Sequence, residues 1–83
     1  MGSRKEQERE AAIAVIKAAA AKLESTFICR DKVESFTGGA IKARHLANMD
    51  SAHLGVAGAF KVGRRQCYPV DSLVDWLISR LDV

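Results

Sequence analysis

The sequence predicts an α+β domain that is mostly α-helical, and three kinds of pattern support this. Several stretches carry apolar residues at helical spacing, a short stretch alternates apolar and polar residues, and glycines separate these stretches. With 83 residues, 48% of them hydrophobic, the chain can form one small core. We expect a helical extension over residues 1–25 and one folded domain over residues 26–83.

The first expected element is a helix from Arg4 to Leu23, because nearly all of its residues favour helices. Its apolar stripe of Ile13, Ile16, Ala20 and Leu23 is narrow and rich in alanine. A helix of this kind can pack on its own domain or pair with its copy in another subunit. Arg4–Leu23 is therefore a candidate surface for a homodimer.

A short strand is expected over Thr26–Arg30, with Phe27 and Cys29 on one side and Ile28 on the other. Cys29 and Cys67 are the only cysteines, and both fall in segments that we expect to be strands. We interpret them as reduced residues that pack as small hydrophobic side chains, because a disulfide is not expected in a cytoplasmic chain. No metal or other cofactor is expected, because the residues of zinc-binding type lack close ligand spacing. These residues are Cys29, Cys67, His45 and His53.

A short helix that contains Val33 and Phe36 is expected next. Asp31 is its expected N-cap, because a carboxylate can accept hydrogen bonds from the backbone N–H groups of the first turn. Glu34 follows three residues later, like the acidic residue of a capping box. Residues 37–39, Thr-Gly-Gly, must end the helix, since two glycines cost too much conformational entropy in a helix interior.

A second helix is predicted from Ile41 to Asp50, with Ile41, Leu46 and Met49 facing inward. The residues left on its outer side are Lys42, Arg44, His45 and Asn48. A loop over residues 51–59 follows, and two glycines make it irregular. Leu54–Ala59 is an apolar part of this loop that we expect to be exposed.

A tight β-hairpin is the most informative feature of the sequence. Phe60–Val62 alternate apolar and polar residues as a half-buried strand does, and residues 66–68 can form the return strand. Gly63 supplies the unusual backbone angles that a tight turn needs. Arg64 and Arg65 are therefore expected at the tip of the hairpin.

Pro69 is expected to stop the return strand, because proline has no N–H to donate to a β-ladder. An amphipathic helix from Val70 to Leu81 then completes the core. Its expected inward residues are Val70, Leu73, Trp76 and Leu77, and its expected exposed residues are Asp71 and Asp75.

This order of elements predicts a helix-turn-helix followed by a β-hairpin wing. The second helix of such a unit fits the major groove of DNA, which is about 12 Å wide. The wing can reach the neighbouring backbone or the minor groove, where arginine binds well. Residues 26–69 hold seven basic and three acidic side chains, a net charge of +4 that suits a phosphate backbone. We therefore expect double-stranded DNA as the partner.

Between residues 28 and 77 the chain also resembles a known family. The matching segments are ICRDKVESFTGG, AIKARHLANMDSAHLG, FKVGRRQCYP and VDSLVDWL. They resemble the AlpA and excisionase-like winged helix-turn-helix proteins, which are relatives of the MerR DNA-binding domain. The resemblance implies a small DNA-binding protein of phage or mobile-element type that regulates transcription or directs excision. One departure is Asp50 at the end of the second helix, because its negative charge would repel phosphate.

Four outer residues of the second helix are expected to read the major groove: Lys42, Arg44, His45 and Asn48. Asn48 suits adenine and Arg44 suits guanine, because each side chain can make two hydrogen bonds to that base. An ordinary surface or partly buried histidine is the alternative for His45. His53 is interpreted as a loop residue without a role in binding.

Two further pairs of basic residues are expected to contact the DNA backbone. Arg64 and Arg65 would hold phosphate or enter the minor groove, and the alternative for them is a solvated turn. Arg30 and Lys32 would anchor phosphate beside the N-terminal amides of the first short helix. The alternative for Arg30 and Lys32 is an exposed position that only keeps the chain soluble.

Other classes of protein fit the sequence less well. An enzyme is not expected, because the phosphate loop G-x-x-x-x-G-K-[ST] is absent and neither histidine has a persuasive carboxylate partner or nucleophile nearby in sequence. No stretch of about 18 apolar residues indicates a membrane span. The polar start indicates no signal peptide, so we expect a cytoplasmic protein. The remaining alternative is an adaptor that keeps the winged fold and binds a recombinase or transcription protein through residues 4–23 and 54–59.

Overall fold

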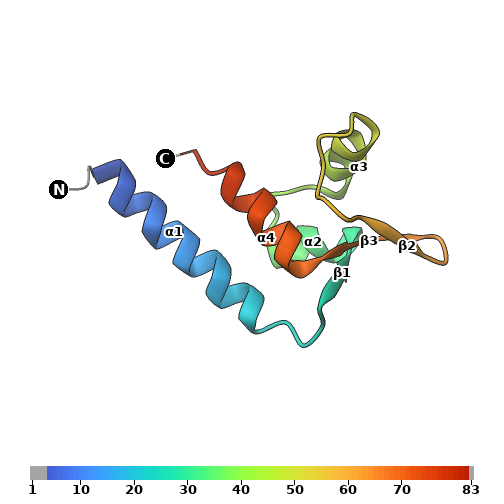
Figure 1. Cartoon of the computed structure of the whole chain (residues 1–83), viewed down its shortest axis with the longest axis horizontal. Helices are drawn as coiled ribbons and strands as arrows, with labels where there is room; N and C mark the ends of the chain where they lie inside the picture. The colour runs from blue at the N-terminus through green and yellow to red at the C-terminus, as the bar shows by residue number, and fades with distance from the viewer. Residues whose placement is uncertain (1–3, 83) are drawn as a thin grey trace.

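The computed structural model describes residues 4–82 of the chain. Over these residues the fold is α+β and mostly helical, with a helix-turn-helix, a hairpin wing and an extra N-terminal helix (Figure 1), which confirms the predicted fold class. The elements in chain order are α1 (Arg4–Ala21), β1 (Phe27–Cys29), α2 (Arg30–Phe36), α3 (Ala43–Ser51), β2 (Phe60–Val62), β3 (Arg65–Pro69) and α4 (Val70–Ser79).

The three strands form one antiparallel sheet in the order β1-β3-β2. Ile28 lies opposite Tyr68, and Cys67 lies between Cys29 on one side and Phe60 on the other. Because side chains alternate along a strand, Ile28 and Tyr68 share the face that packs into the core. The predicted alternation of the first strand is therefore confirmed.

Pro69 ends the sheet without leaving a gap in its hydrogen bonds. It is the last residue of β3 and lies opposite Phe27. The next residue, Val70, donates its N–H to the Thr26 carbonyl at 2.8 Å and begins α4. Backbone N–H groups along a strand point alternately to its two neighbours, so the Pro69 nitrogen points away from β1, toward the side of β2. It meets no partner there, because β2 begins at Phe60, which lies opposite Cys67. Proline is tolerated there because no ladder bond is lost.

The core lies between the inner face of the sheet and the helices. Tyr68, Leu46, Leu73, Val33 and Cys67 are the largest fully buried side chains. All four predicted inward positions of the last helix are buried, and Asp71 and Asp75 are exposed as predicted. The core residues of α4 are Val70, Leu73, Val74, Trp76 and Leu77.

Helix α1 runs antiparallel to α4 along one side of the domain (Figure 1). Arg9 near its start donates to the Ile78 carbonyl at 3.4 Å, and Ile16, Ala20 and Leu23 pack against the core. Still, no residue of α1 is fully buried, because its apolar stripe is thin. The helix thus packs on its own domain, and pairing with a second copy stays a prediction.

Two predictions about helix capping are wrong. The N-cap of α2 is Cys29 and makes no side-chain capping bond, so Asp31 falls inside the first turn. Asp31 forms an ion pair with Arg65 at 2.9 Å instead. Glu34 caps a different helix, because its Oε1 accepts the N–H of Ala43 at 3.1 Å where α3 begins.

Helix α2 ends at the predicted Thr-Gly-Gly turn. Gly39 donates its N–H to the Glu34 carbonyl at 2.8 Å, and Gly38 donates to Ser35 at 3.1 Å. This pair of bonds is the Schellman motif, which needs a left-handed residue after the cap. Gly38 supplies it with φ 65°.

Several predicted boundaries move by one or two residues. The first strand ends at Cys29, because Arg30 already starts α2, and α3 starts at Ala43, where the Glu34 cap lies. Helix α1 ends at residue 21 and α4 at residue 79, both short of the predicted ends. Arg65 belongs to β3, so the two-residue hairpin turn contains only one of the two arginines.

Candidate nucleic-acid interface

Helix α3 exposes a polar face between its N-terminus and its last turn. Arg44 and Asn48 are four residues apart, so they lie on the same side of the helix, and both are exposed. Leu46 on the opposite side is fully buried and fixes the helix to the core. His45 is exposed at the edge of this face, with its ring 6.4 Å from the ring of Trp76 in α4. Arg44 and Asn48 are therefore the side chains best placed to enter a groove.

The wing is a hairpin with a two-residue turn. Val62 pairs with Arg65, which leaves Gly63 and Arg64 as the turn. Gly63 has φ 61° and Arg64 has no positive φ, as in a type II′ turn that matches the strand twist. Arg64 is exposed at the tip. The predicted turn chemistry is therefore confirmed for Gly63 and Arg64.

The two faces of the wing carry different basic residues, one without an ion pair and one paired with a carboxylate. Lys61 pairs with Gln66 and shares the sheet face of Tyr68, which is the face toward α3. Arg65 lies on the other face, where it contacts Asp31 at the start of α2. The wing thus directs Lys61, rather than Arg65, toward the side of α3.

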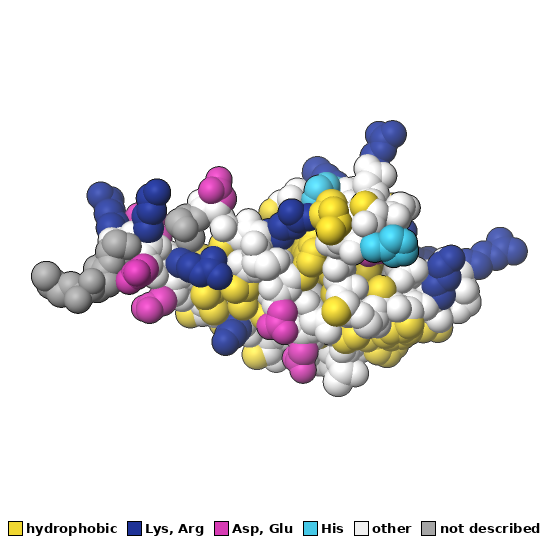
Figure 2. Space-filling model, turned by 45° about the horizontal axis from the view of Figure 1, so that its top comes forward, with side chains coloured by type: hydrophobic (Ala, Val, Ile, Leu, Met, Phe, Trp, Pro, Cys, Tyr) yellow, Lys and Arg dark blue, Asp and Glu magenta, His cyan; other side chains and the backbone are white. Residues whose placement is uncertain are grey.

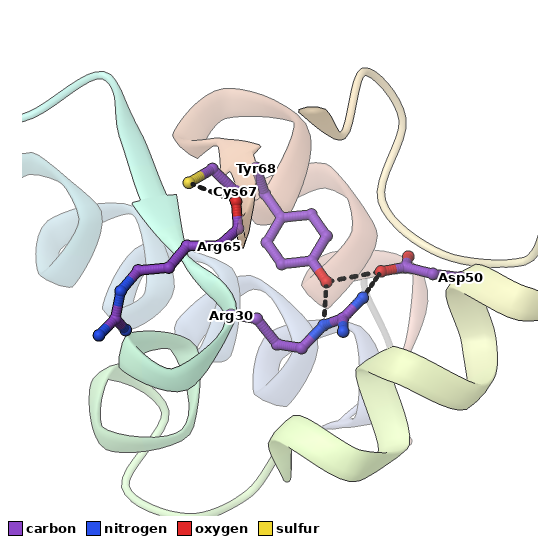
Figure 3. Close-up of polar contacts among 5 residues, drawn as sticks. All are labelled: Arg30, Asp50, Arg65, Cys67 and Tyr68. Carbon is purple, nitrogen blue, oxygen red and sulfur yellow. Dashed lines mark hydrogen bonds and ion pairs between the residues drawn. The ribbon is translucent and has the colours of Figure 1, made fainter. Parts of the chain in front are cut away.

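Three side chains join α2, α3 and β3 beneath this surface (Figure 3). Arg30 donates from Nε to the Tyr68 hydroxyl at 2.9 Å and from Nη2 to Asp50 Oδ2 at 2.6 Å. Tyr68 also donates its hydroxyl to Asp50 Oδ2 at 2.6 Å. We call these three residues the junction triad. It connects the end of α3 to the wing strand β3.

The triad shifts the ionisation of its members. Burial, followed by the hydrogen bond to Asp50, raises the pKa of Tyr68 to about 12. Burial alone would lower the pKa of Arg30, but its bonds to Tyr68 and Asp50 raise it overall. Tyr68 is therefore a neutral donor and Arg30 a full cation at neutral pH. The charge of Asp50 is offset by Arg30, which reduces its repulsion of phosphate.

Every acidic side chain of residues 26–69 is paired with a basic one. Asp50 pairs with Arg30, Asp31 with Arg65, and Glu34 with Lys42, the last at 3.9 Å. Four basic side chains of this segment make no ion pair with any of residues 4–82: Lys32, Arg44, Lys61 and Arg64. The net charge of +4 is carried by these four.

The structure brings most, but not all, of the predicted DNA-binding residues together. Lys42, Arg44, His45 and Asn48 lie at the start or on the outer side of α3, and Arg64 lies at the wing tip. Lys32 lies on the other side of α2, in a groove that it lines with Phe27 and Phe36. Arg30 is bonded within the junction triad. DNA contact by any of these residues stays a prediction.

Lys61 is the basic residue of this surface that sequence reasoning did not include. The signal for it was present, because a two-residue turn at Gly63 fixes the register Lys61↔Gln66. That register places Lys61 on the face of Tyr68. In Figure 2, Lys, Arg and His side chains stand out at the end of the molecule that carries α3 and the hairpin, while basic and acidic side chains are mixed at the end that carries α1.

The loop before the wing, residues 54–59, is exposed as predicted except at Gly55 and Val56. Leu54 is 63% exposed, but Val56 is buried in the core. The Leu54 carbonyl accepts the indole N–H of Trp76 at 3.1 Å, which holds the loop against α4. A larger exposed apolar surface is instead the outer face of the sheet, where Phe27 and Phe60 meet edge to face.

Within residues 4–82, no three His, Cys, Asp or Glu side chains gather in a way that could hold a metal ion. None of the helices in this part of the chain has the length and apolar character to cross a membrane.

Comparison with known proteins adds no assignment. No protein-family model matches the chain, and neither the curated proteins nor the solved structures contain a match. The resemblance to AlpA and excisionase-like proteins therefore stays a prediction from the sequence.

Proposed function

We propose that this chain binds double-stranded DNA, as a small cytoplasmic regulator or excision factor of the phage or mobile-element type. In this proposal α3 lies in the major groove and the wing contacts the neighbouring backbone. Arg44 and Asn48 face the base edges, because they occupy the centre of the exposed side of α3. Lys61 and Arg64 face phosphate from the wing.

The distribution of charge is the observation that carries this proposal. Residues 26–69 hold four basic side chains that make no ion pair with any of residues 4–82; of these, Arg44 lies on α3 and both Lys61 and Arg64 lie on the wing. Unpaired cations can bind phosphate without first giving up a carboxylate. Asp50, whose negative charge would otherwise repel phosphate, is paired with Arg30 at 2.6 Å.

The proposal is tested by titrating the full chain into a labelled random duplex at several salt concentrations. A protein that neutralises about two phosphates, through Lys61 and Arg64, loses affinity with a slope near −2 in a plot of log K against log salt. Arg64→Ala with Lys61→Ala should reduce the slope by about 2, because each removed phosphate contact contributes about 1. Salt-independent binding, or no binding at low salt, would contradict the proposal.

Lys32→Ala provides a matched control for the location of the surface. It removes the same charge from an exposed side chain, but on the side of α2 away from α3. We expect a salt slope close to that of the wild type. An effect as large as that of Lys61→Ala would mean that the DNA lies on another face. Amide NMR shifts at residues 42–48 and 61–66 would locate the surface directly.

A second candidate function is supported by the outer face of the sheet. Phe27, Phe60 and Val62 are 42%, 39% and 53% exposed on this face, and contiguous exposed apolar surface often marks a protein interface. An adaptor that binds a recombinase or transcription protein would use it. DNA-independent binding of such a partner, lost in Phe60→Ser, would favour this function. The two functions can coexist, because this face lies opposite the one shared by Lys61 and Tyr68.

A further inference from the structure

The two cysteines of the chain lie directly opposite each other in the sheet. Cys29 of β1 pairs with Cys67 of β3, and their Sγ atoms are 3.6 Å apart. Both residues point to the outer face, away from Tyr68, as Figure 3 shows for Cys67. Both are free thiols in this structure.

Their position in the ladder suits a disulfide. The Val70 N–H donates to the Thr26 carbonyl, so residues 26 and 70 form a hydrogen-bonded pair of the ladder, and so do residues 28 and 68. The cysteine pair is therefore a non-hydrogen-bonded pair of the ladder. At such positions the Cα atoms are about 4.5 Å apart, within the range that a disulfide bridges. The Sγ atoms must approach to about 2.05 Å, which side-chain rotation can achieve without moving the strands far.

The two thiols differ in their access to solvent. Cys67 is fully buried, and burial, followed by the contact with Cys29, raises the pKa of its thiol. Cys29 is half-buried and lines an open groove of about 480 Å³ between β1 and α2. The charged residues of this groove are Lys32 and Glu24. A reagent in solution can therefore reach Cys29 first.

We propose that Cys29 and Cys67 are a reversible redox-modification site, at which a small-molecule disulfide converts the dithiol to an intramolecular disulfide. The Cys29 thiolate attacks the disulfide of the oxidant, forms a mixed disulfide and releases one thiol. The Cys67 thiolate then attacks Cys29 Sγ and releases the second thiol. Two protein protons and the two electrons end on the two released thiols, so the oxidant is reduced as the protein is oxidised. This site does not depend on the proposed DNA binding.

Intact-mass analysis of the full chain with glutathione disulfide tests the proposal. The expected product is a monomer that has lost two hydrogens, has no thiol left for alkylation, and regains both with dithiothreitol. Oxidation to a disulfide-linked dimer, or persistence of both thiols at oxidising glutathione ratios, would overturn it.

Single variants test the order of the two steps. In Cys67→Ala the mixed disulfide cannot be resolved, so Cys29 should retain one glutathionyl group. In Cys29→Ala the buried Cys67 should react at least about tenfold more slowly. Equal rates in the two variants, both with the circular dichroism of the wild type, would show that Cys29 is not the entry point. The existence of the site is tested separately, by stoichiometric disulfide formation in the wild-type chain.

Discussion

Arg30 and Asp50 meet at 2.6 Å, which fastens the first residue of α2 to the last turn of α3. Tyr68 of β3 bonds to both of them, so three side chains fix how α3 lies against the wing. Arg30 and Asp50 are 28% and 19% exposed, so water screens this pair less than the ion pairs at the surface. The triad is therefore both a stabilising contact and a geometric constraint on the candidate interface.

Removing the carboxylate should destabilise the domain strongly. Asp50→Ala leaves Arg30 charged and partly buried without its partner, and it leaves the Tyr68 hydroxyl with one acceptor fewer. We expect a loss of about 2–3 kcal/mol in the free energy of unfolding, somewhat below the cost of breaking a fully buried pair. Urea denaturation measures this loss. Asp71→Ala, at an exposed carboxylate of α4, is the control and should change stability by less than about 0.5 kcal/mol.

Gly55 should be intolerant of a side chain for a related reason. A Cβ at this position would overlap the Asp50 carboxylate and lie 3.3 Å from the Asp50 Cα. Gly55→Ala should therefore displace Asp50 from Arg30 and cost about 1–3 kcal/mol. The cost should shrink when Asp50 is already alanine, because the carboxylate is then absent. Additive effects in the double variant would disprove this link between Gly55 and the triad.

The local pattern of the sequence predicts most of the fold, because its signals are short-range. The turn at Gly63, the helix end at Gly38 and the inward face of α4 depend on residues within one turn or hairpin. The hydrogen bonds and ion pairs of the carboxylates at the starts of α2 and α3, in contrast, depend on residues far apart in the sequence. Glu34 reaches Ala43 nine residues later, and Asp31 reaches Arg65 across 34 residues. No local pattern distinguishes these carboxylates from ordinary N-terminal caps.

The candidate site was predictable in part for the same reason. Arg44, Asn48 and Arg64 follow from helix spacing and the hairpin turn. Arg30 could not be recognised as an internal residue, because its partners are 20 and 38 residues away. The Cys29–Cys67 pairing likewise depends on the register between β1 and β3, which lie far apart in the sequence.

Tyr68 should make the stability of the fold sensitive to alkaline pH. Its pKa is raised from 10.0 to about 12, so the folded state favours the protonated hydroxyl. The contribution is fully present below pH 10 and is lost as the pH rises through 12, because the unfolded chain releases this proton first. After discounting for solvent screening, we expect a loss of about 1 kcal/mol over this window.

Tyr68→Phe separates this loss from other alkaline effects. The variant has no proton to release at this position, so its stability should fall less between pH 10 and 12 than that of the wild type. Lysine titration affects both proteins alike and cancels in the comparison. Parallel loss of stability in the two proteins, measured by urea denaturation across this range, would mean that Tyr68 does not titrate as described.

The ion pair between Asp31 and Arg65 should weaken any contact of Arg65 with the DNA backbone, because it occupies this cation on the outer face of the wing. Both side chains are exposed, at 57% and 69%, and such pairs are worth about 0.2–1 kcal/mol. Asp31→Asn frees Arg65 and removes a nearby negative charge, so we expect about threefold tighter binding to a random duplex at low salt. The gain should fade at higher salt, because screening weakens exposed charges. It should also shrink in an Arg65→Ala background, where there is no cation to free. The affinity of Asp31→Asn could instead be unchanged while DNA binding still depends on Arg64. That result would place Arg65 outside the interface, and the wing would then contact DNA only through its tip and its side toward α3.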